Sequence, residues 1–180
     1  MHGVIFSELK KFVESQLGPD AWRSLVHEAG LGKRIYLPLS TYPDEEIFAL
    51  VATASRITGI AETALLRSFG EFVAPNLLRM YKAYIKPGWT TLDVIENAEA
   101  QVHTRVRVRE PGATPPFLQA TRVGPKEVRV LYTSARKLCA VAEGFALGLA
   151  NHFGETVTIA HPVCMHDGAA ACELRIVQTA

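Results

Sequence analysis

Apolar residues recur at helical spacing along roughly the first hundred positions of the chain. In residues 2–18, a single broad face carries the apolar side chains of Val4, Ile5, Leu9, Phe12, Val13 and Leu17. This spacing is typical of an amphipathic helix. Further segments with the same character span residues 20–32, 42–59, 60–85 and 90–106. Pro75 lies inside one of them, and we expect it to break or kink that helix.

From about residue 104 the pattern changes to alternation, which predicts strands. The expected strands span residues 105–108, 117–123, 127–134, 156–161 and 171–178, and a helix over roughly 135–153 interrupts them. The predicted fold class is α+β, with a helical N-terminal part packed on a C-terminal antiparallel sheet. We expect one domain over residues 1–180, divided into a helical subdomain (about 1–60) and a sheet-bearing subdomain (about 61–180).

Composition and charge narrow the functional classes. The chain has 48% hydrophobic and 21% charged residues and a net charge of +1, which gives no electrostatic basis for binding nucleic acid. The sequence contains neither a signal peptide nor a membrane span, so we expect a cytoplasmic protein. It also lacks the phosphate-binding loops and nucleophile motifs of common enzymes, and we predict no catalytic activity.

Two features could hold a ligand. His103 lies near the end of the helix predicted over 90–106. There its imidazole can bind a metal or haem iron. Alternatively, it can form a hydrogen bond with a free carbonyl group at the helix end. Tyr132, Ser134 and Arg136 stand two residues apart. If the strand runs that far, all three point the same way, about 7 Å apart. Such a row suits an extended dianion such as the propionate pair of haem, although a solvated strand face has the same pattern.

The three cysteines form a second candidate site. His161 and Cys164 have the spacing of a zinc knuckle, Cys172 follows after a turn, and Cys139 lies one turn beyond Arg136. Together they predict a closed tetrahedral Cys3His site that would hold structural zinc. Three unconnected thiols are the alternative, and His166 competes with His161 for the fourth position. Oxidation of the thiolates would release the metal, which suggests a redox input.

The order of these motifs resembles that of H-NOX domains, the haem nitric-oxide/oxygen-binding sensors related to the haem domain of soluble guanylate cyclase. The resemblance covers essentially the whole chain. It is carried by "MHGVIFSELKKFVE", the helix bearing His103, "PPF", "YTSAR" and "CMHDGAAACELRI". It implies the H-NOX fold, haem b as cofactor and His103 as the proximal ligand of the iron.

The resemblance also implies roles for the residues around the haem. Tyr132, Ser134 and Arg136 would hold the propionates, and either Pro115 or Pro116 would press on the porphyrin. Some H-NOX proteins are similar in carrying a zinc site in the C-terminal tail, usually made by four cysteines. This sequence departs from that pattern, because a histidine stands where a fourth cysteine is expected.

The choice of gas is predicted from a missing side chain. In oxygen-binding relatives, a tyrosine on the helix after the signature donates a hydrogen bond to bound oxygen, and this chain has Val141 at that position. The residues expected to form an apolar distal wall are Ile5, Leu9, Phe69 and Val141. Such a wall favours nitric oxide and carbon monoxide over oxygen. Tyr81 or Tyr84 could still reach the pocket.

The resemblance further implies how a signal leaves the haem. Nitric oxide would weaken the His103–iron bond, and the N-terminal part would then rotate against the sheet. The effector would be a separate protein, a histidine kinase or a cyclic-di-GMP enzyme. The alternative function is a haem-free module that binds a small molecule with the help of zinc or senses redox state through its thiols.

Overall fold

The computed structural model describes residues 1–110 and 112–179. The helices are α1 (Gly3–Leu17), α2 (Ala21–Glu28), α3 (Asp44–Thr58), α4 (Glu62–Met80), α5 (Thr91–Ala98), α6 (Thr104–Arg109) and α7 (Cys139–Phe153). The strands are β1 (Phe117–Gly124), β2 (Glu127–Thr133), β3 (Val157–Val163) and β4 (Cys172–Gln178). Short 3-10 turns η1 (Lys82–Tyr84) and η3 (Met165–Asp167) and a π-helical segment η2 (Glu99–His103) complete the fold. The predicted α+β class is confirmed.

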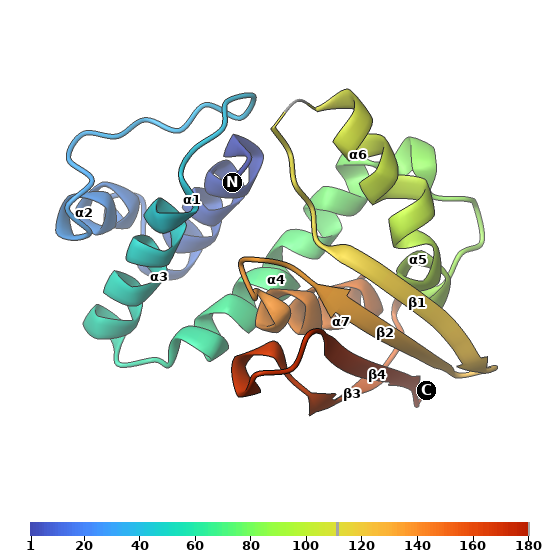
Figure 1. The fold of residues 1–180 in the computed structure, drawn as a ribbon. Coiled ribbons are helices and arrows are strands. Elements are labelled where there is room, and N and C mark those ends of the chain that lie inside the picture. Colours follow the sequence, from blue (N-terminus) through green and yellow to red (C-terminus); the bar gives the residue numbers. More distant parts are fainter. Residues whose placement is uncertain (111, 180) are drawn as a thin grey trace.

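The four strands form one antiparallel sheet in the order β1-β2-β4-β3. In Figure 1 the helices α1, α2 and α3 gather at one end of the molecule and the sheet lies at the other. Within the sheet, Tyr132 at the end of β2 pairs with Leu118 of β1 and with Cys172 of β4. The register therefore places the two candidate ligand-binding segments side by side.

Two large hydrophobic clusters form most of the interior, and α4 contributes to both; a small third cluster contains Tyr132, Cys139, Met165 and Cys172. Phe69 and Val73 of α4 pack with α1, α2 and α3 in the N-terminal cluster. Ala74 and Leu78 pack with α5, α7 and the sheet in the C-terminal cluster. Burial of these apolar side chains is the main term that stabilises each cluster. Helix α4 is thus the common structural element of the two halves.

Helix α4 packs against α7 at very short range because glycines face the partner backbone. A Cβ atom at Gly144 would overlap the carbonyl oxygen of Arg67, and one at Gly70 would overlap the carbonyl oxygen of Val141. Glycine in a helix interior costs stability, so its use here indicates that close approach of the two helices is required. The joint also fixes the start of α7 relative to α4.

Two expectations about helices need correction. The segment 105–108 is not a strand, because the helix that begins at Thr91 continues through the π-helical segment into α6. Its alternation does not follow burial, since Val106 is 9% exposed but Val108 is 81% exposed. Pro75 does not break its helix, as α4 continues to Met80; contacts with both clusters hold the helix together across the missing hydrogen bond.

Within residues 1–110 and 112–179, no single helix is long and apolar enough to cross a membrane. Helices α3 and α4 meet the length and composition requirement only as a pair, and that pair is bent by 111°.

Candidate functional site

His103 ends the π-helical segment between α5 and α6. Helix α5 begins with a capping box, in which Thr90 and Asp93 satisfy each other's backbone N–H groups. The extra residue of the π turn rotates the positions that follow it around the helix axis, and such turns are frequent at functional sites. The turn therefore fixes the direction in which the His103 imidazole leaves the helix.

The imidazole of His103 is largely buried and lines a cavity. Its Nδ1 atom lies 3.4 Å from Oε2 of Glu99, without a well-formed hydrogen bond to any residue in the described part of the chain. Burial lowers the pKa of His103 below its ordinary value, although the Glu99 carboxylate acts in the opposite direction. The imidazole is therefore neutral near pH 7, which is the form that ligates a metal.

The cavity lies between the two large hydrophobic clusters and has a volume of about 310 Å³. Most of its lining is apolar. It collects every residue that the sequence predicted for the cofactor site: Ile5, Leu9, Phe69, His103, Pro115, Pro116, Tyr132, Ser134, Arg136 and Val141. Residues far apart in the sequence thus meet around one space, as expected for a buried ligand.

Tyr132, Ser134 and Arg136 share the cavity, but not as three positions of one strand. Strand β2 ends at Thr133, so Ser134 and Arg136 belong to the turn before α7. The Ser134 hydroxyl accepts a hydrogen bond from the backbone N–H of Arg136 at 3.2 Å. The expected strand spacing is therefore wrong, and a turn brings the three polar groups to the same wall.

Arg136 already has partners from two other segments. Its Nε donates to Oδ2 of Asp44 at 2.9 Å, and its Nη1 donates to the carbonyl of Thr114 at 2.7 Å. A further donor contacts the Thr114 hydroxyl. Asp44 also pairs with the amino group of Met1 at 2.7 Å. Arginine has five N–H donors, so two remain for an anionic group in the cavity.

The two tyrosines that could enter the cavity differ in position. Tyr81 lines it, and its hydroxyl donates to Glu110 at 3.1 Å. Tyr84 is not among the lining residues, and its hydroxyl accepts a hydrogen bond from Arg109. Twelve residues separate Phe69 from Tyr81 along α4, which corresponds to about 18 Å. Tyr81 is therefore remote from the apolar part of the cavity that Phe69 lines.

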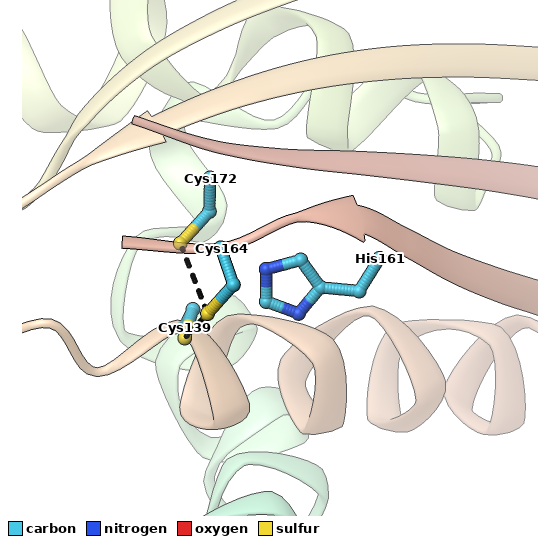
Figure 2. Close-up of side chains that lie close together, drawn as sticks. All are labelled: Cys139, His161, Cys164 and Cys172. Carbon is cyan, nitrogen blue, oxygen red and sulfur yellow. Dashed lines mark hydrogen bonds between the residues drawn. The ribbon is translucent and has the colours of Figure 1, made fainter. Parts of the chain in front are cut away.

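The cysteine cluster lies on the other side of Tyr132. Cys139, His161, Cys164 and Cys172 each offer one donor atom, and these atoms all lie within 4.8 Å of one another. Figure 2 shows the four side chains converging: Cys139 comes from the start of α7, His161 from β3, Cys164 from the residue after β3, and Cys172 from the start of β4. The Sγ atom of Cys164 is 4.0 Å from that of Cys139 and 4.0 Å from that of Cys172.

These separations exclude disulfides but suit a metal ion. A disulfide needs about 2 Å between the sulfurs, whereas thiolates about 2.3 Å from a tetrahedral zinc ion lie about 3.8 Å apart. Burial, followed by the neighbouring Cys172 thiol, raises the pKa of Cys139 to about 12. Burial also raises the pKa of Cys172, so without a cation Cys139 and Cys172 are protonated thiols near pH 7.

The fourth donor of the cluster is His161. His166 does not belong to the group, and its Nε2 lies 2.9 Å from the carbonyl oxygen of Lys137. The Nδ1 atom of His161 lies 2.6 Å from Oε1 of Glu143, and the other carboxylate oxygen contacts Arg67. The Nε2 atom of His161 is buried and has no hydrogen-bond partner within residues 1–110 and 112–179.

Comparison with known proteins identifies the family. A sequence profile described as "Haem-NO-binding" matches residues 2–161. The chain belongs to the haem-NO-binding (H-NOX) family. No curated protein sequence matches it significantly.

Solved structures agree with this membership. An H-NOX protein from S. oneidensis in the Fe(II)NO state has 25% sequence identity and a TM-score of 0.93, with 100% of both chains covered. The SO2144 H-NOX domain from Shewanella oneidensis in the Fe(II)CO state has 26% identity and a TM-score of 0.87, with 99% of both chains covered. A T. tengcongensis H-NOX variant, at 22% identity, shares the fold with a TM-score of 0.87. The family consists of haem-based gas sensors rather than enzymes.

The described residues of this H-NOX domain fit haem. The cavity is mainly apolar, His103 presents a neutral imidazole to it from η2, and Arg136 retains donors for an anionic group; His2, at the N-terminus, also lines the cavity. Sequence reasoning missed three carboxylates next to candidate ligands: Asp44 beside Arg136, Glu99 beside His103 and Glu143 beside His161. Glu99 and Glu143 each had a weak sequence signal, because they lie four residues from His103 and from Cys139, respectively, whereas Asp44 had none.

Proposed function

We propose that this H-NOX domain binds nitric oxide and carbon monoxide at ferrous haem, excludes oxygen and signals to a separate effector protein. Bound haem would supply an iron atom that takes up a diatomic gas. His103 would ligate the iron through Nε2, with Nδ1 turned to Glu99, the arrangement usual for metal-bound histidines. Tyr132, Ser134 and the remaining donors of Arg136 would hold the propionates, and Pro115 or Pro116 would press on the porphyrin.

The apolar character of the cavity around Val141 is the observation that carries the choice of gas. Ile5, Leu9, Phe69 and Val141 line it without a polar atom in their side chains. Bound oxygen is charge-separated and gains from a nearby donor, whereas nitric oxide and carbon monoxide need none. Of the tyrosines that line the cavity, Tyr81 donates its hydroxyl to Glu110, and Tyr132, at the end of β2, is the one that we assign to a propionate. The relatives from S. oneidensis have been solved with nitric oxide and with carbon monoxide.

Absorption spectroscopy of the haem-loaded protein tests this proposal. We expect the Soret band of the anaerobic ferrous protein to shift with nitric oxide and with carbon monoxide. On exposure to air, the same protein should show no stable oxygen complex. A persistent oxygen complex would contradict the assignment, and a colourless protein after supply of haem would contradict haem binding itself.

The N-terminal helices provide a route for the signal. Residues about 1–60 would rotate as one subdomain against residues about 61–180 when His103 is released from the iron. Both halves contact the cavity, and Asp44 at the start of α3 joins Met1 to Arg136. By resemblance to the family, the effector would be a histidine kinase or a cyclic-di-GMP enzyme in the cytoplasm. Capture of a purified candidate kinase only by the nitric-oxide-bound form would support this route.

We also propose a structural zinc ion at Cys139, His161, Cys164 and Cys172. Four donors that already lie within 4.8 Å of one another leave no open position for a substrate, as in structural rather than catalytic zinc sites. Oxidation of the thiols would release the ion and so add a redox input. Metal analysis of the purified protein should find one equivalent of zinc.

A further inference from the structure

Glu143 is a buried carboxylate next to the zinc site but outside its donor set. Glu143 is only 6% exposed, and few other charged residues in the described part of the chain are buried to this extent. It lies four residues after Cys139 on α7, and so on the same helix face. Burying a carboxylate is costly unless its oxygens are matched by donors or cations, and the surroundings of Glu143 supply both.

Each oxygen of Glu143 has its own partner. Oε1 lies 2.6 Å from Nδ1 of His161 on β3, and Oε2 accepts a hydrogen bond from the guanidinium of Arg67 on α4. An ionised carboxylate can only accept hydrogen bonds, so Nδ1 of His161 must carry the proton. In the neutral form of the ring, the lone pair is then on Nε2.

The Nε2 atom of His161 has the properties of an unused ligand. It is buried without a hydrogen-bond partner among the residues that the structure describes, and His161 joins three cysteine sulfurs in one compact donor group. A buried nitrogen lone pair without a partner is costly in a closed interior. A metal ion held by the three sulfurs would satisfy it.

We propose that Glu143 is the positioning residue of the zinc site, and that it fixes His161 in the tautomer and orientation that ligates the ion. Arg67 in turn holds Glu143 and offsets its negative charge. This inference rests on the zinc site proposed above. It explains how a histidine serves where family members usually have a cysteine: the carboxylate makes the imidazole a stronger and better oriented donor.

The same chain of contacts reaches the joint between α4 and α7. Arg67 stands on α4 directly opposite Gly144, the residue after Glu143. Zinc bound by His161 therefore fixes Glu143, and Glu143 holds Arg67 at the closest approach of the two helices. The metal would thus stabilise this joint in addition to the connection between β3 and β4.

The Glu143→Gln substitution in the full-length, haem-loaded protein tests the proposal. Zinc affinity is measured by competition with a chromogenic chelator. We expect Glu143→Gln to weaken zinc binding about 10–100-fold, since the amide is a poorer acceptor for Nδ1–H and presents an N–H group to Arg67 or His161. Glu173→Gln is the matched control. Glu173 follows Cys172 in β4 and, within residues 1–110 and 112–179, forms its ion pair with Arg175 alone, so the zinc affinity of this variant should stay that of the wild type.

A second background separates orientation of His161 from a general effect on folding. In a His161→Cys protein the fourth ligand is a thiolate that needs no carboxylate partner, so adding Glu143→Gln should change zinc affinity less than threefold. An equal loss in both backgrounds would overturn the proposal, because it would mean that Glu143 acts only through packing. Unchanged affinity in Glu143→Gln alone would also overturn it and leave the zinc site standing. Zinc-free wild-type protein would remove the zinc site and this inference together.

Arg67→Met provides a variant that retains the buried carboxylate. The Arg67 side chain is 56% exposed, so the substitution should leave the fold intact. With one anchor of Glu143 removed, we expect a smaller loss of zinc affinity, of a few fold, and none in the His161→Cys background. A loss that persists in that background would show that Arg67 acts independently of His161.

Discussion

The cavity and the cysteine cluster are adjacent, but they differ in how many metal-binding donors they offer and in which parts of the chain supply them. The cavity offers His103 as its proposed iron ligand in a mainly apolar lining that comes from both halves of the molecule. The cluster has four donor atoms within 4.8 Å, all from the C-terminal part. A single ligand leaves room on a metal for a gas, whereas four ligands complete a tetrahedron. This contrast is the basis for the roles proposed above, in which the first site binds a gas and the second one stabilises the fold.

The two sites meet at the start of α7. Arg136 lines the cavity, Cys139 belongs to the cluster, and Val141 lines the cavity again. In the sheet, Tyr132 of the cavity pairs with Cys172 of the cluster. A closed metal site at this place would hold the residues that shape the open one. Predictions that perturb one site and read out the other therefore test the comparison directly.

Removal of the proposed iron ligand should have the largest effect. We expect His103→Gly to lose most of its haem, or to show a ferrous spectrum without the His103 ligand, because His2, the other histidine that lines the cavity, is at the N-terminus with its Nε2 3.9 Å from Glu110. Free imidazole should restore the wild-type spectrum by occupying the space that the side chain leaves. The zinc content should stay unchanged. An unaltered spectrum in His103→Gly would contradict the role of His103.

Loss of one donor from the cysteine cluster should lower the stability of the protein more than it changes gas binding. Cys164→Ala removes the thiol that lies between Cys139 and Cys172, and we expect loss of zinc and a fall in Tm of about 10 °C. His166→Ala is the control, because His166 is exposed and lies outside the donor group. Calorimetry and metal analysis measure both effects. Equal Tm values with and without zinc would contradict a structural role for the ion.

A donor added to the apolar part of the cavity should change the gas preference. We expect Val141→Tyr to raise oxygen affinity about tenfold or more, since one hydrogen bond to a charge-separated ligand contributes about 1.5 kcal/mol. Val141→Phe has nearly the same size without the hydroxyl and should remain unable to hold oxygen. Oxygen binding by both variants, or by neither, would mean that the missing donor does not determine the preference.

Much of the fold followed from periodicity, and the exceptions have physical reasons. Long amphipathic patterns, as in α1 and α3, fixed both the type and the approximate ends of the helices. Residues 105–108 were misread because four alternating positions fit a short strand and a helix end equally well. The π-helical turn before His103 has no pattern of its own in the sequence. It depends on contacts such as those of Glu99 with Arg107 and the Leu118 N–H, which form only in the folded chain.

The site residues that belong to a sequence motif could be predicted. The residues that only contact and orient the motif residues could not. Tyr132, Ser134 and Arg136 were found through the family signature, although their strand geometry was wrong. Glu143 lies eighteen positions before His161, and their contact exists only because α7 packs on β3. Asp44 meets Arg136 across ninety-two positions. Such supporting contacts belong to the tertiary structure and leave no local pattern.

The smallest predicted effect is on stability, and it comes from an ion pair of α5, the helix that precedes His103. Asp93 connects α5 to the sheet through an ion pair with Arg122 of β1 at 2.6 Å. Burial would raise the pKa of Asp93, but hydrogen bonds from Thr90 and the Arg122 guanidinium outweigh it and hold the pKa below its ordinary value. The carboxylate therefore contributes stability above its unfolded-state pKa, about 3.9, and that contribution is lost as the pH falls through the lower folded-state pKa.

We therefore expect Asp93→Asn to lower stability by about 1 kcal/mol at pH 7, because the amide can keep the helix cap but not the ion pair. The difference from the wild type should be constant above about pH 5 and shrink toward zero as Asp93 of the wild type becomes protonated in more acidic solution. Asp20→Asn is the control, since Asp20 is exposed and its side chain makes no cap hydrogen bond. Denaturant unfolding over this pH range measures both variants. A difference that stays the same down to pH 2 would show that the charge of Asp93 is not what holds α5 on the sheet.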